Sequence, residues 1–171
     1  MFHSDSAEAG WFALRVRPNH ERAAERSLHN LGLEAYLPVQ RVRRRWSDRI
    51  KELEAVLFPG YVFCKFGYED RMRVLNSAGV RSIVANGPAP SRVEDAEIEA
   101  VRALLRSGRP ILQCPFVSVG RRVVIHDGPL ASLRGVVMRV KDAWRVVVSV
   151  EAINCSVAIE MDADALAAEK N

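Results

Sequence analysis

A short basic segment spans residues 41–51, with the sequence RVRRRWSDRIK. It holds five arginines and one lysine against the single carboxylate of Asp48, so its net charge is +5, whereas the whole chain carries +4. Arginine and lysine neutralise phosphates, and an indole such as that of Trp46 stacks on a nucleic-acid base. The segment therefore predicts a nucleic-acid contact. Its candidate residues are Arg43, Arg44, Arg45 and Trp46. An alternative with equal support is a solvated hairpin tip whose charges only keep the protein in solution.

Two aromatic residues, Tyr61 and Phe63, lie two positions apart in the strand-like segment 55–66. Residues two apart share one face of a strand, and the residues between them share the other face. If Val62 and Phe66 point into the core, the aromatic pair forms an apolar patch that can bind a partner helix. Leu14 and Ile83 are weaker candidates for the same patch. The alternative is that both aromatic residues belong to the core and are covered by the chain's own helices.

No segment has a pattern typical of catalysis or of metal binding. The chain lacks a nucleophile elbow, a P-loop, a GxGxxG segment and an HExxH segment. Its four histidines are scattered, and its three cysteines lie 50 and 41 residues apart, which is neither a disulfide framework nor a metal-ligand spacing. We therefore expect a binding protein rather than an enzyme, without cofactor or metal, in the reducing environment of the cytoplasm.

The composition of the 171-residue chain limits the remaining classes. With 49% hydrophobic and 27% charged residues, the chain can bury a core, which excludes wholesale disorder. No apolar run approaches the roughly 20 residues of a membrane helix. Residues 1–10 have neither a basic leader nor an apolar region, so we expect no secretory signal and no membrane association.

The elements that would position these residues fall into two regions. Residues 11–108 alternate strand and helix patterns, with Asn19 as the expected N-cap of the first helix and Asp95 as that of the last, whose core face is Ile98, Val101 and Leu105. Residues 109–117 hold two prolines and few charges, which predicts a linker. Residues 118–166 carry only short β runs separated by turn signals, which predicts a small barrel. We expect residues 1–10 to be disordered and residues 167–171 to form a tail.

Three segments, in this order, resemble the NusG family of transcription elongation factors. WFALRVRPNHERAAERSL at 11–28 resembles the first strand and helix of the NusG N-terminal domain, and LFPGYVF at 57–63 is similar to that domain's most recognisable segment. VGRRVVIHDGPLASLRGVV at 119–137 resembles the KOW motif, with Gly128, Pro129 and Gly135 in the expected turn positions. The segments WSDR at 46–49, LFPGYVF, GPAP at 87–90 and DAEIEAVR at 95–102 resemble the specialised paralogues, the UpxY-like and RfaH-like antiterminators, more than the housekeeping factor.

The resemblance covers about residues 11–166 and implies a fold in two parts. The first is an α+β NusG N-terminal (NGN) domain at 11–108, with an antiparallel sheet flanked by helices. The second, after the linker, is an all-β KOW domain at 118–166 that forms an SH3-like small barrel. The β-branched runs of this second region favour strands over a helical form.

The resemblance also implies control of transcription elongation or antitermination by a cytoplasmic, monomeric protein. Its first domain is expected to bind RNA polymerase on the β′ clamp helices, to bridge toward the β subunit, and to suppress pausing or termination. Its KOW domain is expected to recruit a partner, either the termination factor Rho or a ribosomal protein. One alternative is a housekeeping NusG-type factor that couples to Rho or the ribosome. A second is a ribosome-associated KOW protein that binds RNA.

Individual residues take roles from the same resemblance. Tyr61 and Phe63 match the clamp-helix surface, and the basic segment matches a variable hairpin beside upstream DNA and nascent RNA. Arg17, His20 and Arg22 lie where RfaH-like proteins contact non-template DNA. Arg71 and Arg73 stand near a His-Thr-Thr element that touches the β subunit, so they are candidates for a second polymerase contact. The alternative for these two arginines is a plain exposed helix face.

Overall fold

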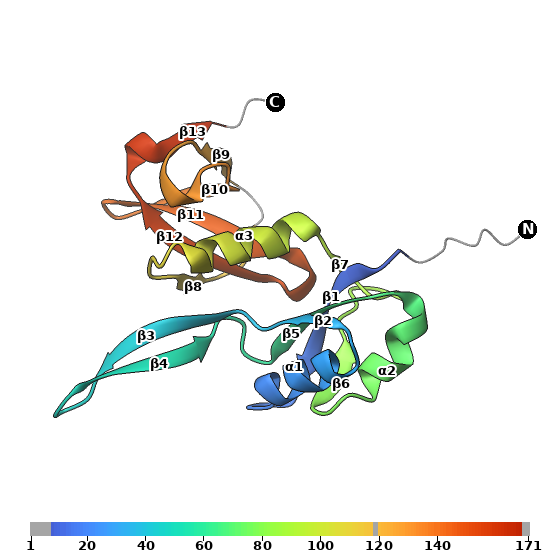
Figure 1. The fold of residues 1–171 in the computed structure, drawn as a ribbon. Coiled ribbons are helices and arrows are strands. Elements are labelled where there is room, and N and C mark those ends of the chain that lie inside the picture. Colours follow the sequence, from blue (N-terminus) through green and yellow to red (C-terminus); the bar gives the residue numbers. More distant parts are fainter. Residues whose placement is uncertain (1–7, 118–119, 169–171) are drawn as a thin grey trace, which may run out of the picture. The chain divides into compact units, whose positions relative to one another are not determined.

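The computed structural model describes residues 8–117 and 120–168 (Figure 1). The chain divides into two compact units, one made of the residues up to Pro38 together with Phe58–Asp95, the other of Val39–Leu57 and the residues from Ala96 onward. The domain boundaries expected from the sequence stay predictions. Most of the expected N-terminal disorder and C-terminal tail lies outside the described residues. Within the described ranges, no helix is long and apolar enough to cross a membrane.

The first unit contains an antiparallel sheet with strand order β2-β5-β1-β6. Its strands are β1 (Gly10–Val16), β2 (Glu34–Tyr36), β5 (Tyr61–Phe66), β6 (Val80–Ile83) and the short β7 (Arg92–Val93), which also pairs with β1. Central strand β1 buries residues of both faces, for example Ala13 and Leu14. A strand buried on both faces needs a nearly continuous apolar sequence, which WFALRV supplies.

Two helices belong to this unit, α1 (Glu21–Asn30) and α2 (Arg71–Leu75), the latter preceded by the 3-10 turn η1 (Tyr68–Asp70). Helix α1 buries Ala24 and Leu28, which lie one turn apart, and the chain leaves it at Gly32 with a φ of +78°. The expected N-cap at Asn19 is wrong. Asn19 has a φ of +62° and lies one residue before the N-cap position, which His20 occupies. The cause is the turn after Pro18, because it needs a left-handed residue and asparagine tolerates that conformation.

The second unit contains the hairpin of β3 (Val39–Arg45) and β4 (Ile50–Val56), a long two-stranded ribbon in Figure 1. It also contains α3 (Asp95–Arg106), which buries Ile98, Val101 and Leu104. The expected core residue Leu105 is only half-buried, and Leu104 takes its place. Both positions lie one turn from Val101, and the helix is rotated slightly toward the earlier one.

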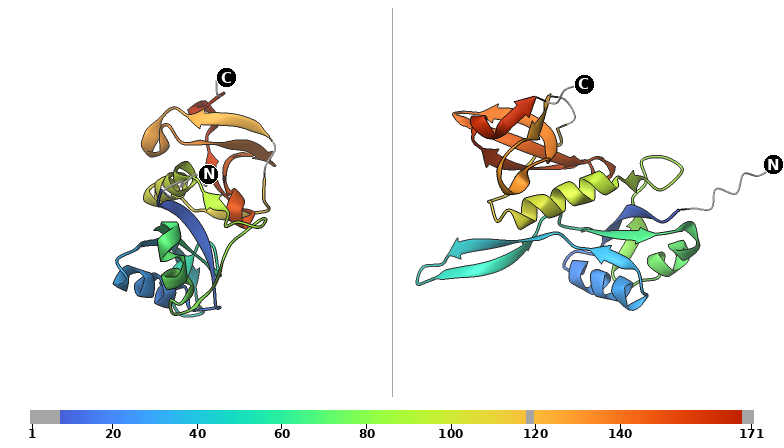
Figure 2. Two further views of the ribbon diagram at one scale, coloured as in Figure 1. Left: turned by 90° about the vertical axis from the view of Figure 1, so that its right-hand side faces the viewer. Right: turned by 45° about the horizontal axis from the view of Figure 1, so that its top comes forward.

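The remaining strands form an antiparallel sheet with strand order β13-β9-β10-β11-β12-β8. Figure 2 shows these strands, coloured from yellow-brown to red, wrapping into a strongly curved sheet. The strands are β8 (Leu112–Cys114), β9 (Arg121–Ile125), β10 (Arg134–Val140), β11 (Ala143–Val150), β12 (Cys155–Met161) and β13 (Leu166–Ala168). Three 3-10 turns connect them, η2 (Gly128–Leu130), η3 (Glu151–Ile153) and η4 (Ala163–Ala165). The all-β C-terminal region is confirmed, and the segment expected as a linker contributes β8 to it.

Candidate protein and nucleic-acid interfaces

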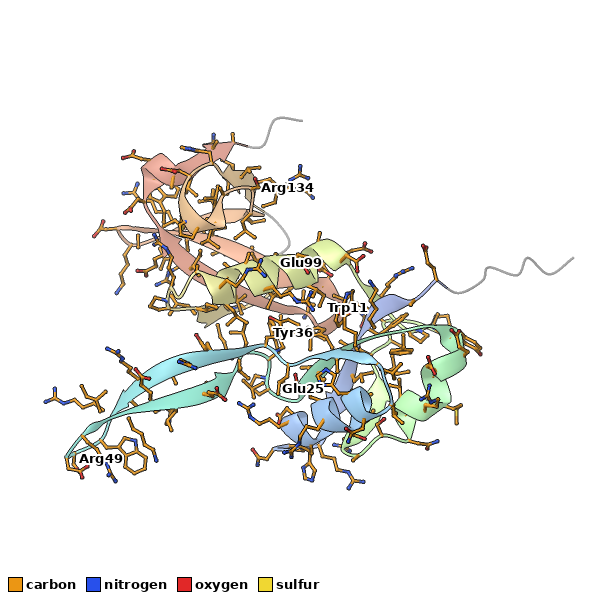
Figure 3. All side chains as sticks on the ribbon, viewed as in Figure 1. Trp11, Glu25, Tyr36, Arg49, Glu99 and Arg134 are labelled. Carbon is orange, nitrogen blue, oxygen red and sulfur yellow. The ribbon has the colours of Figure 1, made fainter. Side chains whose placement is uncertain are left out.

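One face of the first unit's sheet collects aromatic side chains. Strand β5 lies between β1 and β2, where Phe63 pairs with Ala13 and with Tyr36, and Lys65 pairs with Trp11. Paired residues of antiparallel strands point to the same side, so Trp11, Tyr36, Tyr61 and Phe63 share one side of the sheet. Figure 3 labels Trp11 and Tyr36, which come from the strands on either side of β5. We call these four residues the aromatic face.

Leu14 and Ile83, the weaker members of the expected apolar patch, lie on the opposite face. Leu14 pairs with Val62 and with Ile83, so both point to the side of the sheet that Tyr61 and Phe63 do not use. Leu14 is fully buried and Ile83 is half-buried. The structure therefore places Tyr61 beside Phe63, and Leu14 beside Ile83, but does not bring the two pairs together.

Tyr61 and Phe63 differ in how accessible their side chains are. Phe63 is 0% exposed, and its ring meets that of Phe58 edge-on with 5.8 Å between centroids. Tyr61 is half-buried and lies at the end of its strand. Tyr61 is therefore the member of the pair that a partner can reach, whereas Phe63 is buried against Phe58. The assignment of these residues to polymerase binding stays a prediction.

The turn that precedes Tyr61 is held on two sides. The Val16 backbone N–H donates to the Gly60 carbonyl at 2.9 Å, and the Gly60 N–H donates to Oε1 of Glu21 at 3.0 Å. Glu21 is the first residue of α1 and is buried. Gly60 has a φ of +86°, a conformation that side-chain-bearing residues resist. The end of β1 and the start of α1 thus fix the turn at Pro59 and Gly60, and this turn sets the position at which Tyr61 begins β5.

A hollow of about 620 Å³ lies beside Tyr61 and is lined by two arginines that the sequence did not single out. Arg15 pairs directly with Tyr61 across the strands, and Arg81 and Ser82 come from β6. Both arginines are exposed, and neither has an ion pair within the part of the chain that the structure describes. No carboxylate lines the hollow. Only the pairing of β1 with β5 and β6 reveals this cluster, because its residues come from distant segments.

The expected nucleic-acid residues Arg17, His20 and Arg22 occupy the loop between β1 and α1 and the first turn of the helix, and all three are exposed. The Arg17 backbone N–H donates to the Gly79 carbonyl at 2.9 Å, which fixes the start of the loop. His20 Nδ1 lies 2.9 Å from the Pro18 carbonyl, so its ring is oriented locally. The structure therefore places Arg17 and His20 on this loop and Arg22 on the adjoining helical turn, and their role stays a prediction.

The two arginines of α2 lie in different surroundings. Arg73 binds the Asp70 carboxylate at 2.5 Å and also donates to the Leu31 carbonyl at 2.9 Å, so it ties α2 to the end of α1. Arg71 is half-buried, and its Nε atom has no hydrogen-bond partner among the described residues. Arg73 therefore has a structural task, and the expected second polymerase contact stays a prediction for both residues.

Strands β3 and β4 keep one register along the hairpin, from Val39 opposite Val56 to Arg45 opposite Ile50. Arg43 forms an ion pair with Glu52 at 3.1 Å, and Arg41 lies opposite Glu54. Arg44 lies opposite Lys51. Figure 3 labels Arg49 at the tip, where the indole of Trp46 is 56% exposed. The structure therefore brings Arg44, Arg45 and Trp46 to an exposed tip and assigns Arg43 to a neutralised pair.

Backbone geometry explains why glycine stands at positions 128 and 135 of the barrel. Gly128 has a φ of +79°, and its N–H donates to Oδ1 of Asp127 at 2.7 Å, ahead of Pro129. A Cβ on Gly135 would lie 2.7 Å from Val146 Cγ1 and 2.8 Å from the Val147 carbonyl oxygen, so only glycine fits there. Gly128 and Pro129 therefore lie in the turn η2, as expected, whereas the turn position expected for Gly135 is wrong, because Gly135 lies within β10 opposite Val123, where close strand packing requires glycine.

Neither a metal centre nor an activated thiol is found among the described residues. No group of three or more His, Cys, Asp or Glu side chains in residues 8–117 and 120–168 could hold a metal ion. All three cysteines are free thiols. Burial, with the nearby carboxylates of Asp70 and Glu34, raises the pKa of Cys64 to about 12, and burial also raises the pKa values of Cys114 and Cys155. These thiols are therefore poor nucleophiles.

The described residues thus form a helix-flanked antiparallel sheet with exposed cations beside Tyr61, a basic hairpin and a small all-β barrel, the features of a binding protein. The family model described as "Transcription termination factor nusG" matches residues 9–102. The chain therefore belongs to the NusG family of transcription termination factors, which confirms the resemblance seen in the sequence. This is a family of transcription factors and is not known as a family of enzymes.

Two relatives show how far the likeness extends. The transcription termination/antitermination protein NusG of Lactococcus lactis subsp. lactis (strain IL1403) is 25% identical over 172 residues, covering 92% of this chain and 91% of that protein. Among solved structures, that of Thermotoga maritima NusG aligns with a TM-score of 0.55 and 18% identity over 95% of this chain and 98% of that chain. The α+β fold with a C-terminal KOW barrel is thereby confirmed along nearly the whole chain.

Proposed function

We propose that this protein is a transcription elongation and antitermination factor of the specialised branch of the NusG family. Its N-terminal region binds the β′ clamp helices of RNA polymerase in the cytoplasm and suppresses pausing or termination. The observation that carries the proposal is the aromatic face, on which the half-buried Tyr36 and Tyr61 are accessible beside the buried rings of Trp11 and Phe63. Aromatic side chains supply most of the binding energy of many protein interfaces, and a helix is a common occupant of such a face.

The accessible end of this face supports a defined contact. Tyr61 is half-buried, and the exposed Arg15 and Arg81 border the hollow next to it. An aromatic anchor with flanking cations fits an amphipathic helix that carries carboxylates beside its apolar stripe. In this arrangement Tyr61 contacts the partner, and the buried Phe63 belongs to the packing of the sheet against Phe58.

The barrel serves as a recruitment module for a protein partner, either Rho or a ribosomal protein. Residues 118–166 hold six basic and six acidic side chains, so the region carries no net charge. Arg145 binds Glu160 at 3.1 Å and Arg139 stacks over the ring of Trp144, which occupies two of its cations. A barrel that bound RNA would carry an excess of basic residues. The charge balance therefore favours the polymerase-bound factor over a ribosome-associated RNA-binding protein.

Nucleic acid is a secondary contact in this proposal. The exposed loop residues Arg17, His20 and Arg22 and the basic hairpin supply the cations, and phosphate contacts of this kind position a protein without reading sequence. Arg71 and Arg73 complete the proposed set as a second contact with the β subunit.

A pull-down of the full chain on an immobilised β′ clamp-helix fragment tests the main contact. Replacing Tyr61 by alanine is expected to weaken retention by about tenfold or more, because truncation of an interface anchor costs roughly 2 kcal/mol. Tyr68→Ala is the matched control, since Tyr68 is a tyrosine of the same unit that is 71% exposed and belongs to the 3-10 turn η1 rather than to the sheet. Retention that Tyr61→Ala and Tyr68→Ala leave equally unchanged would contradict the proposal.

A further inference from the structure

The β3–β4 hairpin has two faces of different charge. Strand alternation puts Arg41 and Arg43 on one face, opposite Glu54 and Glu52 of the partner strand. The ion pair of Arg43 with Glu52, at 3.1 Å, and the position of Glu54 opposite Arg41 compensate two of the three arginines on that side, which we call the neutralised face. This neutralised face also carries Arg45 and Ile50 at its tip end. The basic run read from the sequence alone therefore overstates the charge of this side, because the two carboxylates follow residue 51.

On the other face, among the described residues, only Arg49 has a carboxylate nearby, that of Asp48 at 3.8 Å. Arg44 lies directly opposite Lys51, and neither side chain has an ion pair with any residue that the structure describes. Like charges in directly opposed positions destabilise a pair of strands. An anion placed between the two side chains removes that repulsion, so this position is suited to a phosphate.

An indole extends the same face toward the tip. The Trp46 backbone N–H donates to the Arg49 carbonyl at 2.8 Å, which continues the strand pairing by one residue pair beyond Arg45 and Ile50. By alternation, Trp46 and Arg49 follow Arg44 and Lys51 on their side of the ribbon. Trp46 is 56% exposed, and Arg49 lies 3.8 Å from Asp48. Deeper along this face, Val42 lies opposite Leu53, and both are half-buried.

We propose that this cationic face, made of Arg44, Trp46, Arg49 and Lys51, binds single-stranded nucleic acid. The inference deepens the nucleic-acid contact of the proposed function and rests on it, but it does not depend on polymerase binding. Arg44 and Lys51 hold the phosphates, and the indole of Trp46 stacks on an adjacent base. A duplex keeps its bases stacked on one another, so only an unpaired strand offers a base to an exposed indole on a ribbon.

The test uses fluorescence anisotropy of the full chain with a labelled single strand, as DNA and as RNA, and with the matching duplex. The salt dependence of the affinity counts the phosphates that are contacted, at about 0.7 in logarithmic slope for each on a single strand. Arg44→Gln combined with Lys51→Gln is expected to lower the slope by about 1.4. The matched control, Arg41→Gln combined with Arg43→Gln, removes the same charge from the neutralised face and is expected to change the slope by much less.

The indole has its own matched control at the tip. Trp46→Ala is expected to weaken single-strand binding by about tenfold, within the range for loss of one stacked base, whereas Ile50→Ala, which truncates a 68% exposed side chain of the other face, leaves it unchanged. Equal slopes for the two charge variants, equal losses for Trp46→Ala and Ile50→Ala, or tighter binding of the duplex would each overturn the proposal. Because no polymerase is present, these outcomes are independent of the clamp-helix pull-down.

Discussion

Replacing Glu21 by alanine tests how the turn before Tyr61 is held. Its buried carboxylate accepts the Gly60 N–H at 3.0 Å, and alanine leaves that N–H without its partner. A hydrogen bond to a charged group contributes about 1.5–3 kcal/mol, and an acidic residue in the first helical turn adds about 0.3–1 kcal/mol. We therefore expect Glu21→Ala to lower the free energy of unfolding by about 2–4 kcal/mol. Over a chain of this length, that corresponds to a Tm decrease of roughly 4–16 °C.

Urea denaturation followed by circular dichroism measures this loss, and two further variants isolate its cause. Glu21→Gln keeps an oxygen that can accept from Gly60, so it is expected to cost only about 1 kcal/mol. Arg26→Ala, at an exposed position of the same helix, is expected to stay within about 0.5 kcal/mol of the parent protein. If glutamine were as costly as alanine, or if alanine were as harmless as the Arg26 variant, the hydrogen bond would not be what holds the turn.

Two other predictions concern the barrel and a buried thiol. Gly135→Ala is expected to destabilise the protein by about 1–3 kcal/mol, because its Cβ would lie 2.7 Å from Val146 Cγ1. In the same thermal melt Gly87→Ala, whose Cβ meets nothing within 4 Å, is expected to be neutral, and equal melts for the two variants would contradict the reasoning. Cys64 has a pKa near 12 in the folded chain against an ordinary value of 9.0, so the folded state keeps a proton that the unfolded state loses above about pH 9. Stability should therefore fall as pH rises through that value, and by less in Cys64→Ala. Urea midpoints at about pH 8 and about pH 10 measure the difference, and parallel declines in both proteins would refute this role of the thiol.

The membership of each sheet face shows what can be predicted from the sequence. A period of two correctly places Tyr61 and Phe63 on one side of their strand, because parity within a strand is a local property. It cannot say which residues of β1 share that side, since this depends on the pairing of Arg15 with Tyr61 across a long stretch of chain. A shift of one residue in that register exchanges the two faces. For this reason Leu14 was expected beside Tyr61 and lies on the other face.

Burial of the aromatic residues follows from packing that no local pattern records. Phe63 was expected to be exposed with Tyr61, yet its ring packs edge-on against Phe58 from the LFPGYVF segment itself. The intervening turn at Gly60 is what allows two nearby residues to meet in this way. Arg15 and Arg81 were missed for a related reason, because each is an ordinary surface residue until β1 and β6 are paired.

The charge of the hairpin bears on the two interpretations that the sequence left open with equal support. If its arginines served only to keep the protein in solution, their positions relative to carboxylates would not matter, and the two faces would be alike. The neutralised face shows that these strands do accommodate acidic residues opposite arginine, as Arg43 and Glu52 demonstrate. On the other face, Arg44 lies directly opposite Lys51, at a position where a neutral pair could stand. This pairing of like charges is unfavourable in the free protein. A repulsive pair beside an exposed indole is therefore better explained by an anionic ligand than by solubility.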